Sequence, residues 1–346
     1  MNKIKLILIA IAVAAAGQQF FGSRSADAQA KVETAGQKFK NIKVLNDVPA
    51  DQIGPIMNIM SASLGVDCKM CHASNDRDFE KDGNEHKDIA REMLKMTFAI
   101  NKQFFEGKTE VTCNTCHGGR ERPIAVPNLM QVVREERPKQ PATKPTVEQI
   151  LAKYEAALGG KAALAKIKSR HITATRVEPD GKTTEPEEIW QEPGMFRVDT
   201  RYGDYLISEV VEGEKVRKTG NKEPITLRPD EMEQIRREAQ LFANPDLASV
   251  YTKLDFRFVD RIDGREVYLV LGTTSSGARE RLYFDTATGF LVRRVATAMT
   301  VIGPFPFQVD MSDHRDFGGV KLPATVRYAM PAISWTRKIQ EVRNNP

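Results

Sequence analysis

All four cysteines of the chain lie in two copies of one short pattern, Cys-x-x-Cys-His, at residues 68–72 and 113–117. Two thiols at this spacing can reach the two vinyl groups on one edge of a porphyrin, and the next histidine can supply a nitrogen to the iron. The pattern is the attachment signature of c-type haem. We therefore predict two covalent haems, with thioether bonds from Cys68, Cys71, Cys113 and Cys116, and with His72 and His117 as proximal iron ligands.

Other uses of paired cysteines explain the pattern less well. A zinc site would favour a shorter gap than the one between Cys71 and Cys113. A thioredoxin-like redox pair would need a single Cys-x-x-Cys at the start of a helix that follows a strand. Structural disulfides suit an exported protein but leave both histidines unexplained. Haem attachment accounts for the cysteines and the histidines together.

Each haem iron also needs a sixth ligand or an open site. The chain has only five histidines, and methionine is a common distal ligand in cytochromes c. Two Met-x-x-Met pairs precede the two haem motifs along the chain: Met57 and Met60, then Met93 and Met96. Methionines at helical spacing are more often core residues, but a haem motif after each pair favours a ligand. Spacing alone does not choose within a pair.

The methionine pairs fall on two predicted helices. The first carries an apolar stripe and ends at Gly65, and the second carries a similar stripe and ends near Gly107. The stripes consist of Ile53, Met57, Met60 and Leu64, and of Ile89, Met93, Met96 and Ile100. The sequence therefore repeats one unit, in which a helix with two methionines is followed by a loop and a haem motif.

The first part of the chain divides further by composition. Residues 1–28 predict a signal peptide, with a positive start, a short apolar run and an Ala-x-Ala cleavage site at residues 26–28; an uncleaved anchor is the alternative. We expect a periplasmic protein, free or membrane-associated. Residues 29–125 would form the dihaem cytochrome c domain, and the proline-rich residues 126–146 predict an extended linker with one short helix near 129–136.

Residues 147–346 follow a different pattern and contain no cysteine. Helices are predicted over 147–157 and 229–242. Alternating segments around turn signals, such as residues 170–177 and 183–190 around Pro179-Asp180-Gly181, predict antiparallel hairpins. The expected fold class is α+β, with an N-terminal all-α dihaem domain followed by an antiparallel half-barrel-like sheet with helices. The formal net charge of +5 is too weak and diffuse to indicate nucleic-acid binding.

Residues 90–101 and 111–119 together resemble the cytochrome c subunit of photosynthetic reaction centres, and the earlier helix with residues 68–72 is similar to the preceding haem segment of that family. The resemblance implies that the first methionine of each pair is the distal ligand, Met57 for the first haem and Met93 for the second, with Met60 and Met96 as fallbacks. The chain departs from the family in having cysteines for two haems, where the family usually has four.

The C-terminal part resembles the lipoprotein-carrier half-barrel more loosely, in a hairpin at residues 283–292 and a turn and strand at residues 316–323. A curved sheet of this kind could hold an apolar ligand or dock a protein. No residue there carries identifiable chemistry.

These features predict an electron carrier rather than an enzyme. Two His/Met-ligated haems would accept and donate single electrons between a redox donor and acceptor, which include a membrane-bound electron-transfer complex or a photosynthetic reaction centre. A peroxidase-like enzyme with one open haem and a ligand-binding module built on the C-terminal sheet are the alternatives.

Overall fold

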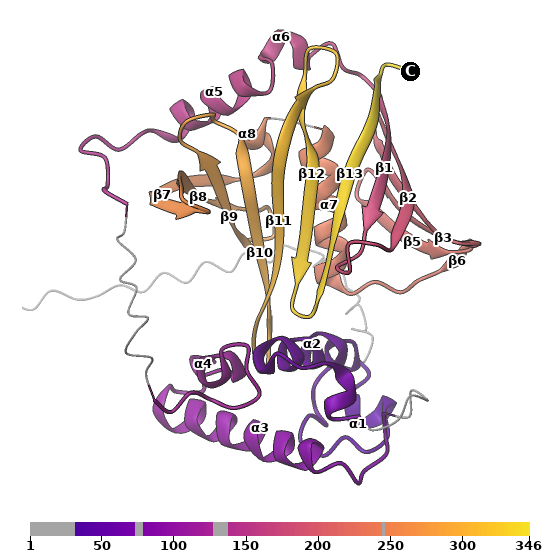
Figure 1. Ribbon diagram of the computed structural model, residues 1–346, viewed down its shortest axis with the longest axis vertical. Helices are drawn as coiled ribbons and strands as arrows, with labels where there is room; N and C mark the ends of the chain where they lie inside the picture. The colour runs from indigo at the N-terminus through magenta and orange to yellow at the C-terminus, as the bar shows by residue number, and fades with distance from the viewer. Residues whose placement is uncertain (1–31, 73–78, 127–137, 244–245) are drawn as a thin grey trace, which may run out of the picture.

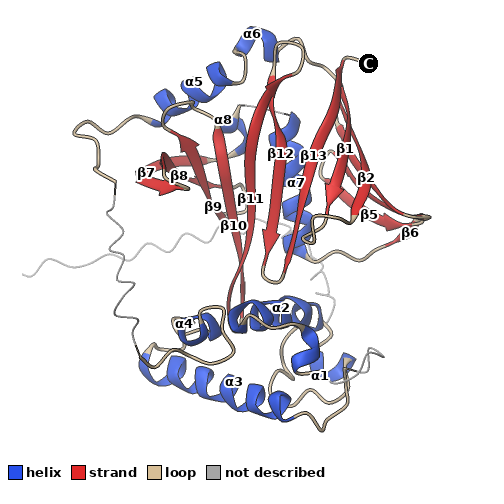
Figure 2. Ribbon diagram, viewed as in Figure 1, coloured by secondary structure: helices blue, strands red, loops and turns tan. Residues whose placement is uncertain are grey.

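The computed structural model describes residues 32–72, 79–126, 138–243 and 246–346. A helical unit, residues 32–126, lies at one end of a large antiparallel sheet (Figure 1, Figure 2). This arrangement confirms the predicted α+β class. The predicted signal peptide and the predicted linker helix near 129–136 lie outside the described residues.

The helical unit contains four α-helices and two short 3₁₀ helices among its described residues. They are α1 (Ala35–Lys38), η1 (Ala50–Gln52), α2 (Ile53–Leu64), η2 (Cys68–Met70), α3 (Glu85–Phe104) and α4 (Cys113–His117). Gly65 ends α2 in the left-handed conformation, as the sequence predicts. A Cβ at this position would lie 2.2 Å from the carbonyl oxygen of Gly119, and Gly119 N donates to Ser63 O at 2.8 Å. Glycine therefore lets the end of α2 pack against the segment that follows the second haem motif.

The rest of the described chain forms one thirteen-stranded sheet with a few helices. In the sheet the strands follow the order β6-β5-β4-β3-β2-β1-β13-β12-β11-β10-β9-β8-β7. The elements are α5 (Val147–Ala157), α6 (Lys161–Leu164), β1 (Arg170–Val177), β2 (Thr184–Glu192), β3 (Met195–Tyr202), β4 (Tyr205–Glu212), β5 (Lys215–Gly220), β6 (Glu223–Pro224), α7 (Pro229–Ala243), α8 (Leu247–Val250), β7 (Lys253–Ile262), β8 (Arg265–Thr273), β9 (Arg279–Asp285), β10 (Leu291–Thr300), β11 (Gly303–Asp316), β12 (Lys321–Met330) and β13 (Ile333–Asn344). All neighbouring strands run antiparallel.

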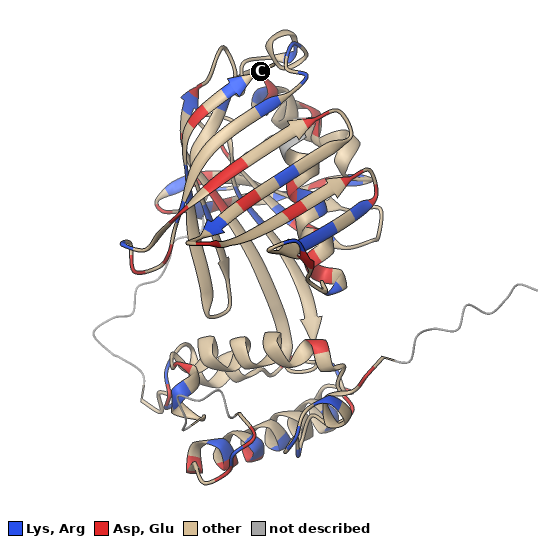
Figure 3. Ribbon diagram, turned by 90° about the vertical axis from the view of Figure 1, so that its right-hand side faces the viewer, with Lys and Arg blue, Asp and Glu red and all other residues tan. Residues whose placement is uncertain are grey.

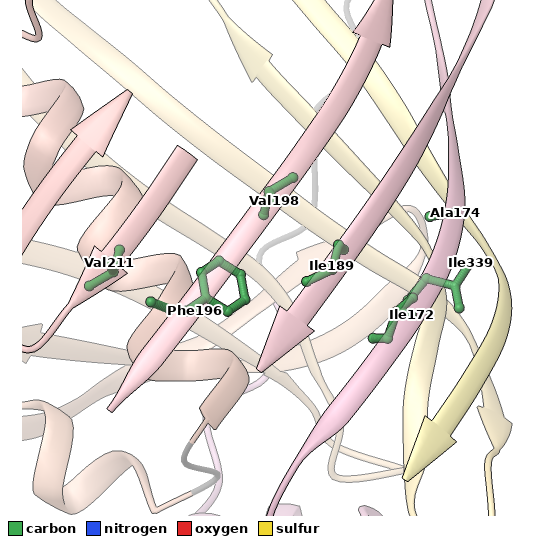
Figure 4. Close-up of a cluster of buried hydrophobic side chains, with 8 residues drawn as sticks. Ile172, Ala174, Ile189, Phe196, Val198, Val211 and Ile339 are labelled. Atoms are coloured by element: carbon green, nitrogen blue, oxygen red, sulfur yellow. The ribbon is translucent and has the colours of Figure 1, made fainter. Parts of the chain in front are cut away.

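The sheet curves around α7, which lies against its inner face (Figure 1, Figure 2). Ala239 of α7 belongs to a buried apolar cluster with side chains of β1 to β4 and β13. Figure 4 shows seven members of this cluster: Ile172, Ala174, Ile189, Phe196, Val198, Val211 and Ile339. Buried residues alternate with more exposed ones along β1, β2 and β3, which is the pattern of a sheet with one face covered.

Buried ion pairs fix α7 and its neighbours in place. Arg337 Nε donates to Glu187 Oε2 at 2.6 Å. On the other side, Glu280 accepts from Arg237 and Arg294, each at 3.2 Å, and from the Tyr251 hydroxyl at 2.6 Å. Both carboxylates are almost fully buried, and every such charge needs partners because burial removes its hydration. The inner face of the sheet is thus occupied by a helix and by paired charges.

The β10–β11 hairpin runs past the end of the sheet and reaches the helical unit (Figure 1). Its strands pair as far as Thr300 and Gly303, whereas β12 joins β11 only at Gln308. Ile302 and Phe305 at its tip are buried in one apolar cluster with Ile56 of α2 and Leu94 of α3; its buried members are Leu45, Val48, Ile56, Ile59, Leu94, Ile302 and Phe305. The two parts of the molecule therefore share a core.

Within the described ranges, no helix has the length and apolar character needed to cross a membrane.

Candidate haem-binding site

Each Cys-x-x-Cys-His motif forms about one helical turn. In the first, Asp67 caps the turn by accepting from Lys69 N at 2.9 Å. The second motif is α4 itself, capped by Thr112, whose backbone N–H donates to the Thr115 hydroxyl at 3.0 Å. A helical turn brings residues three and four apart to the same side. Both thiols and the histidine of a motif can therefore reach one planar porphyrin.

All four cysteines are described and none forms a disulfide. Cys68 and Cys116 are exposed, whereas Cys71 and Cys113 are half-buried. Burial raises the pKa of both half-buried thiols, and the neighbouring Cys68 raises that of Cys71 further. Each motif thus has one half-buried thiol and one exposed thiol.

The rings of the two histidines have different surroundings. His117 Nδ1 lies 3.0 Å from the carbonyl oxygen of Arg120. A carbonyl only accepts, so Nδ1 carries the hydrogen and Nε2 keeps its lone pair, the arrangement typical of a metal-ligating histidine. Burial, helped by the charge of Lys87, lowers the pKa of His72, which keeps this ring neutral at pH 7. The buried Nδ1 of His72 has no hydrogen-bond partner among the described residues.

The methionines of α3 lie on a face that the described protein does not cover. Met93 is 39% exposed and Met96 is 45% exposed, whereas Leu94, Thr97 and Asn101 on an adjacent face are buried. Exposed apolar stripes of this kind usually mark a binding surface. The stripe predicted from the sequence therefore exists, and it offers thioether sulfurs to a large apolar group.

The methionines of α2 are more enclosed. Met57 and Met60 are half-buried and pack against the cluster that contains Ile56 and Ile59. This helix packs against α4, which carries the second motif. The structure therefore brings both methionine pairs and both motifs into one small unit, and its uncovered apolar side chains, thiols and imidazoles fit haem.

Two asparagines that the sequence reasoning missed hold the motifs to the two ends of α3. At the start, Asn84 caps the helix by accepting from His86 N at 3.0 Å, and its Nδ2 donates to Met70 O, inside the first motif, at 2.9 Å. A cap residue before a helical stripe was the available signal.

At the other end, Asn101 fixes the loop that leads into the second motif. Its Nδ2 donates to Val111 O at 2.7 Å, and its Oδ1 accepts from Val111 N at 2.9 Å and from Glu110 N at 3.2 Å. Asn101 is buried on the same face as Leu94 and Thr97. A polar residue on a buried helical face was the signal that could have identified it.

A third polar cluster holds the loop after the first motif. Asp82 accepts from Lys43 at 2.7 Å and from Arg91 at 2.9 Å. The hydrogen bond from Lys43, together with those from Asn41 and Arg91, holds the pKa of this carboxyl far below its usual range. The same loop presents Phe79 edge-on to the His72 ring, with centroids 5.1 Å apart.

Paired thiols, metal-competent imidazoles and methionine helices are together the features of a c-type cytochrome. Residues 10–164 match the model of a family described as the photosynthetic reaction centre cytochrome C subunit. The reaction-centre cytochrome c subunit of Rubrivivax gelatinosus is 35% identical over 95 residues, and that of Roseobacter denitrificans is 29% identical over 102 residues. These matches cover 26% and 27% of this chain and confirm the resemblance of the helical unit to that family.

The chain spans only about a quarter of the length of these curated relatives, 25% and 28% respectively. The sheet is similar to a LolA superfamily protein from Nitrosomonas europaea (TM-score 0.41, 11% identity, 59% of this chain and 95% of that one). It is also similar to an outer-membrane lipoprotein-sorting protein domain from Vibrio parahaemolyticus (TM-score 0.38, 9% identity, 57% of this chain and 91% of that one). At these scores the likeness supports no inference about a ligand.

Proposed function

We propose that this protein is a periplasmic dihaem c-type cytochrome that passes single electrons between redox partners. Residues 29–125 form its haem domain after a signal peptide at 1–28, and residues 126–146 link it to the sheet domain at 147–346. Covalent haems on the two Cys-x-x-Cys-His motifs supply the one-electron chemistry. His72 and Met57 hold the first iron, and His117 and Met93 hold the second.

One observation carries the proposal. The helical unit presents Met93 and Met96 on an apolar face of α3 that its own described residues do not cover, and it also contains Met57, Met60 and both Cys-x-x-Cys-His motifs. Asn84 and Asn101 hold both motifs to the ends of one helix, which would keep the two haems at a fixed separation. A fixed separation suits electron exchange between them.

Haem content tests this first. The protein, made in a host that matures c-type cytochromes, should give two haems per chain in a pyridine haemochrome assay. C68S/C71S and C113S/C116S should each retain one covalent haem. Finding none or one in the unaltered protein would refute the proposal.

Ligation is tested by substituting each methionine alone. Met57→Leu and Met93→Leu should each abolish the Met-to-iron charge-transfer absorption of one ferric haem. Met60→Leu and Met96→Leu are matched controls on the same helices and should retain it. Loss in the controls instead would reassign the ligand. A high-spin, ligand-accessible haem in the unaltered protein would support the peroxidase-like alternative.

A reaction-centre partner is the second candidate, and the family match over residues 10–164 favours it. Purified photosynthetic reaction centres mixed with the reduced protein should oxidise its haems after a light flash, at a rate that depends on protein concentration. Oxidation by respiratory membranes alone would favour another acceptor.

A further inference from the structure

We propose that the tip of the β10–β11 hairpin, residues 300–305, is a positioning element for the second haem motif and forms one wall of that haem's pocket. The inference rests on the proposed function, because it assumes haem on Cys113 and Cys116. It assigns a role in the redox site to the sheet domain, in which the sequence showed no chemistry.

The hairpin extends beyond the other strands of the sheet, and its tip is buried by another part of the molecule. Residues 295–309 contain no charged side chain, and neither do residues 328–336 at the neighbouring β12–β13 turn. Figure 3 shows the strand ends that point toward the helical unit without charges. Residues 303–307 of β11 pair with β10 alone, so sheet pairing does not explain why Ile302 is 0% and Phe305 is 5% exposed. The helical unit buries them.

The hairpin touches the second motif at its first turn. Gly303 has a φ of +136°, and a Cβ built there would lie 2.8 Å from Cγ2 of Thr112. Thr112 is the cap of α4 and directly precedes Cys113. The hairpin backbone therefore lies against the residue from which the haem-attachment helix begins, and glycine allows the close approach.

The shared cluster includes Cys113 of the second motif and also the methionine pair proposed for the first haem. Cys113, Met57 and Met60 pack against the cluster formed by Ile302, Phe305 and the helices. Among the described residues of the first motif, none belongs to it. The hairpin thus lies directly against the second motif, whereas it reaches the first site only through the methionine helix α2.

This asymmetry has a redox consequence. An apolar shell lowers the local dielectric constant, which disfavours the more highly charged oxidised iron and raises the potential. The covered haem should have the higher potential of the two. Removing the Phe305 ring should admit water and lower the potential of this haem more than that of the first.

The test measures both midpoint potentials and the haem content of the full-length protein. Phe305→Ala should lower the midpoint potential of the second haem by about 59 mV, a tenfold change in the one-electron equilibrium. Gly303→Ala should also lower this potential. Phe258→Ala, at an exposed ring on β7, and Gly277→Ala, at an open turn with a φ of +83°, are the matched controls. Phe305→Leu should restore most of the potential, because it keeps the site apolar.

Single-haem backgrounds identify the haem concerned. With C68S/C71S only the second haem is left, and Phe305→Ala should shift its potential. With C113S/C116S only the first is left, and the same change should shift its potential by clearly less. Equal shifts of both haems, or no shift with both haems present, would overturn the inference. An unaltered protein without haem would instead refute the proposed function.

Discussion

The sheet and the helical unit bury their apolar side chains to very different degrees. Among the described residues, ten of the fifteen exposed large apolar side chains lie in the helical unit, and three of the other five, Met299, Val301 and Ile333, lie at the hairpin ends that point toward it. The sheet pairs even its buried charges, such as Glu187 and Glu280. Protein side chains alone fill the core of the sheet. The helical unit, by contrast, needs both a bound apolar group and the β10–β11 hairpin to cover its apolar side chains.

The largest effect is expected when the haem groups are removed. Changing all four cysteines to serine should prevent haem attachment and unfold the helical unit, because its uncovered apolar faces lose their partner. The sheet should still unfold cooperatively as before. Circular dichroism would show the loss of helix, and thermal melting would retain the transition of the sheet. A serine variant with unchanged helix content would show that the helical unit folds without haem and would contradict this contrast between the two parts.

The second prediction concerns the sheet, whose core needs no bound group. Glu280→Gln leaves the buried charge of Arg294 without its carboxylate partner and Arg237 with Glu233 alone, which should cost the sheet about 3–5 kcal/mol. Urea unfolding followed by tryptophan fluorescence measures this. Asp255→Asn at the exposed pair with Lys253 is the control and should cost at most about 1 kcal/mol. The haem absorption spectrum should be the same in both variants.

The third prediction is a pH effect confined to the sheet. His314 is stacked on Phe290 with centroids 3.9 Å apart, and burial lowers its pKa to about 4. The unfolded chain, with a histidine pKa of about 6.5, binds the proton first as the pH falls, so stability is full above pH 6.5 and is lost between 6.5 and 4. The loss should reach about 2–3 kcal/mol. His314→Gln should flatten this part of the pH profile, and an unchanged slope would contradict the assignment.

The smallest expected effect is at a polar contact of the helical unit. Asn101→Ala removes three hydrogen bonds to residues 110–111 and should destabilise this unit by about 1–3 kcal/mol. Asn101→Asp keeps the acceptor and should lose less. The melting of the haem absorption bands measures both. Equal loss in the two variants would show that the donor alone matters.

Local patterns predicted much of this fold. The stripe over Ile53–Leu64 with Gly65 after it gave α2 with its observed bounds, and α5 and α7 were predicted equally closely. The hairpins around residue 180 and at residues 283–292 also form as predicted. These elements depend on residues a few positions apart, which periodicity and turn chemistry report directly.

The features that were missed depend on distant contacts. Pro304 and Pro306 argue against a strand, yet both lie in β11, where it has a partner on one side only. The burial of Glu187 by Arg337 joins residues 150 positions apart. The packing of Ile302 beside Cys113 joins residues even more distant. No local pattern reports such contacts. The haem ligands themselves stay predictions.

The position of the β10–β11 hairpin late in the chain sets an order of assembly. In a chain that emerges from the translocation channel with its N-terminus first, Ile302 follows Cys113 by 189 residues. For that interval the second motif has its cysteines and histidine but lacks the wall that later covers it. Contacts so far apart in sequence also form late in folding. Attachment of the haem can therefore take place on an open unit, which the arriving hairpin then closes.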